Sequence, residues 1–462
     1  MEDADATPLG IDGSETCATL TFELLNFFNE NYVITRHAST ACVISVKEKD
    51  EFGVETNQIM NYANFKQCTS HIKMCIGEKK TMVCAAPLWL EDSRARRYHQ
   101  AVFYPTPPGR DPQRFPYQSR DRPMFNLFKG WPVSVHVPLG GTCETYLELL
   151  LHGMCSGVEA DYEYLVNLMA FAVQRPDVKQ GVSVIFNSGQ GTGKGQAVTH
   201  FGALFGASFV TASQASHVTS HFNGFLRTAL LLFVDEAALI DPKVQGIVKA
   251  MITEESQLCE NKGLDAKMSR SFYDVWMASN LENCIRLDND DRRCFMPCVS
   301  TKYQGDKAFF TKLNAEMAQG GQEALFSFLV QRDLTGFDRH ERPRSERSSA
   351  LLFEQKFHSM SSVERFIFHG LQNSEPPFDV PGKKISHQDL NASFNVFLDT
   401  SRDRSSESVP SRSLIRKLTS TLPGGVIDHG NSHNKRFKSF APLPVLREAF
   451  QFHFKAPASI WD

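Results

Sequence analysis

The chain has 462 residues, of which 42% are hydrophobic and 22% are charged, and its formal net charge is −3. This composition is that of a globular protein, and the charge excludes an overall basic surface, so any contact with nucleic acid must come from local patches. No apolar run approaches the length of a membrane span and the N-terminus lacks a signal-peptide pattern, so we expect a soluble, intracellular protein with no membrane partner. The 11 cysteines are irregularly spaced, which indicates free thiols in a reducing compartment.

The composition and apolar pattern of the N-terminal third predict a tail followed by a mixed α/β region. Residues 1–15 are acidic and predict a flexible tail. Residues 16–145 predict the mixed region, with an apolar helix over 20–28 and a strand over 41–46. Residues 105–123 are rich in Pro, Arg and Asp and predict a solvated loop, because proline excludes regular structure there.

Four residues in this region have a spacing that resembles a zinc site. Cys68, His71 and Cys75 form a C-x-x-H-x-x-x-C pattern, and Cys84 follows. Apolar residues alternate through the same stretch, which favours strands with half-buried thiols over zinc ligands. Both interpretations are left open here.

A phosphate-binding loop is the main feature of the central region. Residues 146–180 predict a lead-in helical segment, and residues 181–336 predict an α/β domain whose first strand covers 182–186. A glycine-rich loop, a lysine and a helix start follow that strand, which is the arrangement that cradles phosphates. The residues expected to contact the nucleotide are Ser188, Gly189, Gln190, Gly191, Thr192, Gly193, Lys194, Gly195 and Gln196.

The loop departs from the common phosphate-loop pattern at two positions. Ser188 replaces the first glycine, and Gly195 replaces the hydroxyl residue that normally binds Mg²⁺ after the lysine. We therefore expect the magnesium to depend on phosphate oxygens, water and a carboxylate from elsewhere in the chain.

Two further strands end in polar residues. The apolar run 230–234 ends in Asp235 and Glu236, which suits a magnesium ligand followed by a general base that polarises the attacking water. A second run, 275–279, ends in Asn280, whose amide could hold that water or the γ-phosphate, or could simply cap the strand. In a parallel sheet these strand ends share one edge, so the predicted catalytic groups meet there.

Two basic pairs complete the candidate site. Arg292 and Arg293 suit an arginine finger that stabilises charge on the transferring phosphoryl group, and the alternative is a surface ion pair with the adjacent acids. Lys262 and Lys267 flank a predicted hairpin tip, where they would bind DNA phosphates without sequence preference or would simply be solvated.

The C-terminal part predicts a connector and a small module. Residues 337–374 form a charged connector and a helix, and residues 375–462 form a helix-rich, winged-helix-like module with a basic face. That face could bind DNA, or the module could be a cap that stabilises a ring. The overall prediction is an α/β protein with a parallel-sheet core.

In this order, the motifs resemble those of superfamily 3 helicases, and more closely the helicase part of phage and large-DNA-virus primase–helicase proteins of the poxvirus-type branch. The loop Gly189–Gly195 is similar to a variant phosphate loop of that group, and Ile252–Glu254 and Asp291–Arg293 also match. The resemblance implies an AAA+-like core and a hexameric ring with ATP and Mg²⁺ bound between its subunits. It also implies that hairpins line a central pore and that the ring travels along single-stranded DNA.

The function expected from the resemblance is that of a replicative, ATP-dependent DNA helicase. The alternative is a P-loop ATPase that is not a helicase, such as a loader, packaging factor or remodelling factor. Relatives often carry a primase domain, but the segment before residue 146 is short and shows no acidic catalytic triad. We therefore expect a separate primase or polymerase as a partner, at the replication site of a virus, phage or mobile element.

Overall fold

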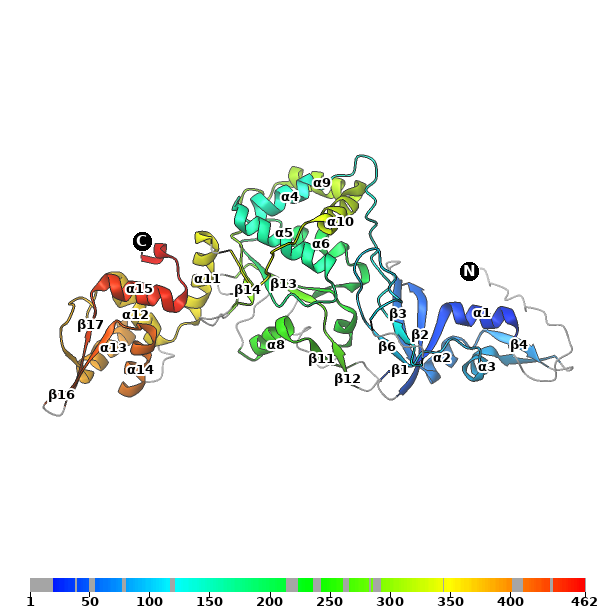
Figure 1. Cartoon of the computed structure of the whole chain (residues 1–462), viewed down its shortest axis with the longest axis horizontal. Coiled ribbons are helices and arrows are strands. Elements are labelled where there is room, and N and C mark those ends of the chain that lie inside the picture. Colours follow the sequence, from blue (N-terminus) through cyan, green and yellow to red (C-terminus); the bar gives the residue numbers. More distant parts are fainter. Residues whose placement is uncertain are drawn as a thin grey trace.

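The computed structural model describes residues 20–37, 40–49, 55–76, 80–116, 121–212, 223–235, 242–260, 266–281, 284–285, 292–343, 345–400, 410–432 and 435–461. Figure 1 shows three bodies in a row along the long axis: an N-terminal body, a central domain and a C-terminal module. Within the described residues, no helix is long and apolar enough to cross a bilayer.

The N-terminal body packs helices against an antiparallel sheet in the order β1-β2-β3. Its core contains Trp89, which is fully buried, stacks on Phe28 at 5.4 Å between ring centroids and donates its Nε1 hydrogen to Asn29. The elements are α1 (Phe22–Asn31), β1 (Tyr32–His37), β2 (Thr40–Lys49), β3 (Glu55–Asn61), α2 (Tyr62–Cys68), β4 (Lys73–Ile76), β5 (Thr81–Cys84), α3 (Ala85–Glu91), β6 (Gln100–Val102) and β7 (Met124–Asn126).

The zinc-like cysteine cluster folds as a short hairpin. Strands β4 and β5 pair antiparallel with Cys75 opposite Met82 and Lys73 opposite Cys84, as the alternating apolar residues predicted. The thiol of Cys84 donates to the Ser70 carbonyl at 3.6 Å. In the part of the chain that the structure describes, no group of three or more His, Cys, Asp or Glu side chains could hold a metal ion.

The central domain contains a five-stranded parallel sheet in the order β14-β8-β13-β10-β9. Its helices and strands are α4 (Glu144–Glu148), α5 (Glu159–Gln174), β8 (Ser183–Asn187), α6 (Lys194–Ala203), β9 (Phe209–Ala212), β10 (Leu231–Val234), α8 (Pro242–Thr253), β11 (Ser256–Cys259), β12 (Lys267–Arg270), β13 (Asp274–Ser279), β14 (Cys294–Phe295), α9 (Lys307–Glu316) and α10 (Gln322–Gln331). Shorter helical turns cover Leu149–Met154, Gly206–Ser208, Gly224–Thr228 and Met317–Gly321. This sheet confirms the predicted α/β class.

Alternate residues of the strands pack into two different cores. Val184 and Phe186 of β8 pack on one face, with apolar residues of α5, α6 and α10. Ile185 packs on the other face, with residues of α8 such as Val248 and Ile252. Both faces are covered, as Figure 1 shows, which is why the middle residues of β8, β10 and β13 are apolar without a polar residue between them.

The C-terminal module combines helices with a small antiparallel sheet in the order β15-β17-β16. An aromatic core fills it, in which Phe368 stacks on Trp461 at 5.5 Å and lies 5.6 Å from Phe450. The elements are α11 (Glu346–Ser359), α12 (Ser362–Asn373), β15 (Ile385–Ser386), α13 (His387–Thr400), α14 (Ser411–Thr421), β16 (Val426–Ser432), β17 (Lys435–Phe440), α15 (Leu443–Phe454) and a terminal turn (Ala458–Trp461).

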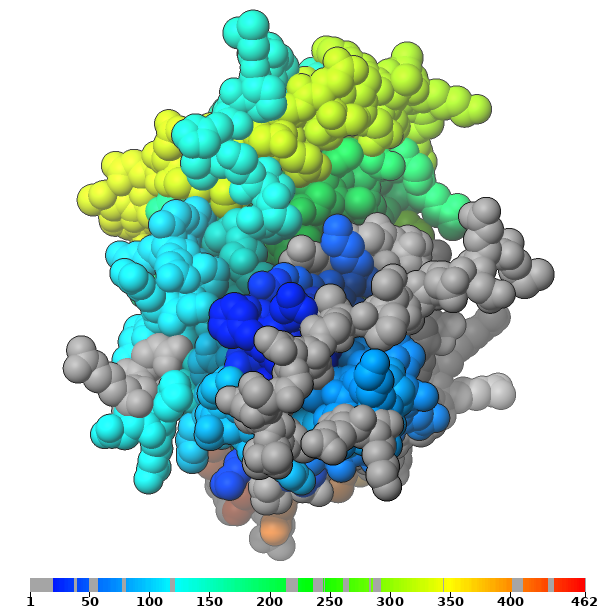
Figure 2. All heavy atoms as spheres, turned by 90° about the vertical axis from the view of Figure 1, so that its right-hand side faces the viewer, coloured from blue at the N-terminus to red at the C-terminus, as the bar shows by residue number. Residues whose placement is uncertain are grey.

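A segment after β7 joins the N-terminal body to the central domain. The indole of Trp131 lies 5.4 Å from the ring of Phe205 and 5.3 Å from that of Phe326. The backbone amides of Thr145 and Tyr146 donate to the carboxylate of Glu316 at 3.1 and 3.2 Å. In Figure 2 this cyan segment rises from the N-terminal body along the central domain. The domain boundaries drawn from the sequence stay predictions.

Candidate functional site: a phosphate-loop cavity at the sheet edge

Glycine conformation shapes the loop between β8 and α6. Gly191 and Gly193 have φ angles of 77° and 97°, in the left-handed region that side chains disfavour. At Gly193 a Cβ atom would also lie 2.8 Å from the ring of Phe310. A left-handed residue next to a right-handed or turn residue can turn successive backbone N–H groups inward and form a concave anion-binding surface. The two left-handed glycines of the loop are compatible with such a surface.

The side chain of Lys194 lies folded against this loop. Its Nζ atom donates to the carbonyl oxygens of Ser188 and Gly189 at 2.9 and 2.8 Å, to the Ser188 hydroxyl at 3.0 Å, and to Asn280 Oδ1 at 2.9 Å. Burial lowers the pKa of Lys194, and the nearby Asp235 carboxylate opposes that shift. An ammonium has three hydrogens, so these four acceptors share them. All four are neutral, and a phosphate oxygen would be a stronger partner.

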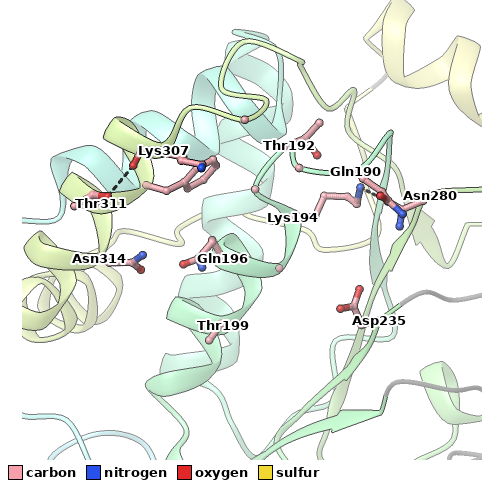
Figure 3. A pocket seen from close by; sticks show the side chains of 15 residues that line it. Gln190, Thr192, Lys194, Gln196, Thr199, Asp235, Asn280, Lys307, Thr311 and Asn314 are labelled. Atoms are coloured by element: carbon pink, nitrogen blue, oxygen red, sulfur yellow. Dashed lines mark hydrogen bonds between the residues drawn. The ribbon is translucent and has the colours of Figure 1, made fainter.

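The strand order brings three predicted residues together. Strand β13 lies between β8 and β10, with Ser279 opposite Asn187 and Met277 opposite Val234. Asn280 and Asp235 follow β13 and β10 directly, so both lie at the edge where Lys194 begins α6. Figure 3 shows Lys194 pointing at Asn280, with Asp235 below them. Ligands bind at this edge of parallel sheets.

These residues line one open cavity with a volume of about 1050 Å³. The loop and α6 form one wall, from Gln190 to Gln196 and at Thr199, and Asp235 and Asn280 lie at one end. Helix α9 supplies the opposite wall, which the sequence did not predict. The lining residues from α9 and the turn before it are Gly305, Lys307, Phe310, Thr311 and Asn314.

The donor set fits a magnesium ion that enters with a nucleotide. The Asp235 carboxylate faces the cavity, and Mg²⁺ typically takes one or two carboxylates together with phosphate oxygens and water. The Thr192 hydroxyl is buried and bonds the Ser188 hydroxyl at 2.9 Å, so it is engaged within the loop. Gly195 lines the cavity, and an added Cβ there would meet nothing within 4 Å. Glu236 lies outside the described residues.

The two arginines lie at the opposite edge of the sheet. Arg292 and Arg293 precede β14, and β14 pairs with the first residues of β8, with Cys294 opposite Ser183. The carbonyl of Arg293 accepts from the Ser183 amide at 2.6 Å. The phosphate loop follows the other end of β8, so the structure does not bring these arginines together with Lys194 of the same chain.

The predicted hairpin is present as β11 and β12, which pair antiparallel. Its tip lies outside the described residues, and so does Lys262. Lys267 is on the half-buried face, where burial and the neighbouring Arg227 guanidinium lower its pKa to about 8. Leu258 and Met268 are paired on the other face, and they are 48% and 59% exposed. The outward face of the described hairpin therefore carries this apolar pair, with Ser256 and Arg270 paired at its base.

Comparison with known proteins gives a family match for part of the chain. A family profile described as a family of unknown function (DUF5906) matches residues 186–293, which run from within β8 to the residue before β14. The DNA primase-polymerase of Nitratiruptor phage NrS-1 is homologous, with 27% identity over 178 residues, which are 37% of this chain and 24% of the relative. The chain therefore matches about a quarter of that relative's length.

Solved structures match over most of the chain. The apo structure of the NrS-1 C-terminal region superposes with a TM-score of 0.62 at 16% identity, covering 90% of this chain and 98% of that one. A second apo structure of the same region, in its A form, gives a TM-score of 0.62 at 17% identity with the same coverage. The chain thus shares its fold with the C-terminal region of the phage NrS-1 protein.

Proposed function

We propose that the chain is an ATP-dependent DNA helicase of the superfamily 3 type that acts in the replication of a phage or virus genome. The observation that carries the proposal is the convergence of Lys194, Asp235 and Asn280 on one cavity at the carboxyl edge of a parallel sheet. Each residue ends a different strand or begins the helix after it, as the proposed chemistry requires.

The phosphate loop binds the triphosphate in this proposal. Lys194 exchanges its neutral acceptors for phosphate oxygens, and the inward N–H groups of the loop bind the same anion. Asp235 holds the magnesium ion, whose charge neutralises the phosphates. Glu236, the next residue, takes the general-base role, and Asn280 orients the attacking water or the γ-phosphate.

DNA is the proposed partner. The NrS-1 relative is named as a DNA primase-polymerase, which supports DNA as the partner here. The hairpin β11–β12 is the proposed contact with single-stranded DNA, with Lys262 and Lys267 as its phosphate ligands. A separate primase or polymerase remains the proposed protein partner.

A ring, proposed as a hexamer, explains the position of the arginines. Arg292 and Arg293 lie across the sheet from the phosphate loop of their own chain, so they could serve as fingers only for a neighbouring subunit. The proposed ring therefore places each nucleotide between two copies of the chain.

The C-terminal module is proposed as a winged-helix unit. Its sheet order, β15-β17-β16, joins the ends of a β–α–α–β–β segment, with the β16–β17 hairpin as the wing. Helix α14 buries Leu414 and Leu418 and exposes Arg412 and Arg416 on the opposite face. An exposed basic helix face supports DNA binding over a purely structural cap.

Three proteins test the site together: the wild type, Lys194→Ala and Glu236→Gln. The wild type is expected to hydrolyse ATP in the presence of Mg²⁺. Lys194→Ala loses the phosphate contacts and should bind ATP poorly, whereas Glu236→Gln should bind ATP and fail to hydrolyse it. Nucleotide binding and phosphate release are measured in parallel. Near-normal turnover by both variants would reject the proposal.

A further inference from the structure

The cavity changes in chemical character from one end to the other. The end at the sheet edge carries the charged side chains Lys194 and Asp235. The part between α6 and α9 carries amides, hydroxyls and a phenyl ring, with Lys307 at the start of α9 as its charged side chain. A nucleotide has the same polarity, with charged phosphates at one end and an uncharged sugar and base at the other. The far end therefore has the chemistry of a nucleobase subsite.

Two contacts before α9 fix its position beside the phosphate loop. The Gly305 amide donates to the Gly191 carbonyl at 3.2 Å, and Gln304 Nε2 donates to the Gln190 carbonyl at 2.7 Å. Asp306 then caps the helix by accepting from the Phe309 amide at 2.9 Å. The distance between α9 and the loop is thus set by direct hydrogen bonds.

The side chains that α9 presents to the cavity occupy one helix face. Lys307, Phe310, Thr311 and Asn314 follow the i, i+3, i+4, i+7 spacing of such a face, and all four line the cavity. The ring of Phe310 packs against Gly193, so it extends the loop surface toward Asn314. Figure 3 shows Asn314 facing Gln196 and Thr199 of α6 across the space.

A hydrogen-bonded chain sets the orientation of the Asn314 amide. Gln322 Nε2 lies 3.4 Å from His200 Nδ1, and an amide nitrogen can only donate, so Nδ1 accepts. The ring hydrogen is then on Nε2, which donates to Asn314 Oδ1 at 3.0 Å. Asn314 keeps both Nδ2 hydrogens and one Oδ1 lone pair for a ligand, and no hydrogen bond engages Nδ2 within the described residues.

We propose that Asn314 and Phe310 form an adenine-recognition subsite, with His200 as a positioning residue that holds the Asn314 amide. This proposal rests on the nucleotide site proposed above. An asparagine amide matches adenine through N6 and N7, because its oxygen accepts from the amino group while its nitrogen donates to the ring. Guanine presents two acceptors at the corresponding edge, so it leaves the amide oxygen without a donor. The Phe310 ring supplies an apolar surface for the base or ribose.

Competition binding separates the two ends of the cavity. A fluorescent ATP analogue is displaced from the wild type by ATP, by GTP or by inorganic tripolyphosphate, each with Mg²⁺. The wild type should bind ATP about tenfold or more tightly than GTP. Asn314→Ala should bind ATP more weakly than the wild type by about the same factor. Its affinity for tripolyphosphate should stay unchanged, which would also show that the cavity is still folded.

Two further variants sharpen the test. Asn314→Asp removes the amide donor that pairs with N7 of either base, so it should weaken the binding of ATP and of GTP alike. His200→Ala should lower the ratio of ATP affinity to GTP affinity without changing tripolyphosphate binding. His200→Gln, which keeps a hydrogen-bond donor, should restore part of that ratio. Lys312→Ala is the matched control, because Lys312 is exposed on α9 and does not line the cavity.

The outcomes are distinct for the two proposals. Equal affinity of the wild type for ATP and GTP, with tripolyphosphate binding that Lys194→Ala abolishes, would overturn the adenine subsite and leave the phosphate site standing. Loss of tripolyphosphate binding in Asn314→Ala would also overturn the subsite, because it would make the residue structural. Failure of the wild type to bind any of these ligands would overturn the nucleotide site and the subsite together.

Discussion

At the residue scale, the surroundings of three glycines decide which substitutions the proposed phosphate loop tolerates. Gly191 and Gly193 have left-handed backbone angles, and Gly193 also lies against the Phe310 ring. Gly195 is the second residue of α6, has no left-handed angle and faces open space. The backbone geometry thus favours glycine at positions 191 and 193, whereas it does not at position 195, where the unusual glycine follows the lysine.

Gly195→Ser should therefore be tolerated. Serine has a better helix propensity than glycine, so the free energy of unfolding should stay the same or rise by about 0.5 kcal/mol. The added hydroxyl would reach the proposed magnesium position, so ATP hydrolysis should persist with a lower Mg²⁺ requirement. Thermal unfolding and a magnesium titration of ATP hydrolysis measure both effects.

Gly193→Ser is the matched control for this prediction. Its Cβ atom would lie 2.8 Å from Phe310 and its backbone angle disfavours any side chain, so ATP binding should be lost. Complete loss of activity in a folded Gly195→Ser protein would contradict the open space at that position.

At the element scale, Glu364 couples two helices of the C-terminal module. It closes a capping box with Ser361 at the start of α12, and it accepts from Lys417 of α14 at 2.9 Å. Burial alone would raise the pKa of Glu364, but the hydrogen bonds from Ser361 and Lys417 outweigh it and hold that pKa below its ordinary value. The charged form is therefore the one that stabilises the folded module.

The stability of α12 should consequently fall in acid. Because the pKa of Glu364 is lower in the folded protein, its carboxylate stabilises the fold fully at a pH above its ordinary pKa of about 4.5. That stabilisation is lost as the pH falls through the lower pKa of the folded protein. Hydrogen exchange of the α12 amides should show wild-type protection exceeding that of Glu364→Gln by about 1 kcal/mol at pH 7. The difference should shrink toward pH 3. A difference that does not vary with pH would show that the carboxylate charge is unimportant.

The hairpin β11–β12 gives a second prediction at this scale. The Lys262→Ala, Lys267→Ala protein should keep its basal ATPase, because Lys267 does not line the proposed nucleotide cavity and neither lysine belongs to the glycine-rich loop. Single-stranded DNA should no longer stimulate that ATPase. The slope of the logarithm of the DNA-binding constant against the logarithm of the salt concentration should become shallower by about 0.7 for each lost phosphate contact. Because Lys267 is on the half-buried face, Lys262→Ala alone should cause most of the loss.

Binding isotherms and unwinding assays at several salt concentrations measure this effect. Lys66→Ala, an exposed lysine of α2, is the control. Normal strand separation by the double variant at every salt concentration would remove the hairpin from the DNA path.

The sequence predicted the sheet edge well because its strands are buried on both faces. The apolar runs before Ser188, Asp235 and Asn280 are typical of central strands of a parallel sheet, and the polar residues after such strands share an edge. The orientation of Lys267 could not be predicted, since a shift of one residue in hairpin register exchanges the two faces. The role proposed for Asn314 depends on contacts with residues more than 100 positions away, such as His200, which no local pattern encodes.

At the scale of the whole molecule, the proposed finger role of the arginines requires a second subunit. Arg292 and Arg293 lie at one edge of the sheet and the phosphate loop at the other, so a single chain contains each half of the proposed interface but does not join them. A finger supplied by a neighbour is worth about three to five orders of magnitude in rate. Catalysis should therefore depend on assembly.

Mixing two inactive proteins tests this dependence. The Arg292→Ala, Arg293→Ala protein keeps the phosphate loop, and Lys194→Ala keeps the arginines, so some mixed interfaces combine two intact halves. ATPase activity should reappear on mixing and should follow the concentration of mixed assemblies. An active wild-type monomer, or no recovery in assemblies shown to be mixed, would argue against shared sites.

The most direct test of the central claim is ATP hydrolysis by the wild type with and without single-stranded DNA, in the presence of Mg²⁺ and with Lys194→Ala as the blank. A DNA motor should hydrolyse ATP slowly alone and several-fold faster with DNA, because DNA binding and nucleotide turnover are coupled. A rate that DNA leaves unchanged would contradict the helicase proposal and favour an ATPase that loads, packages or remodels other molecules.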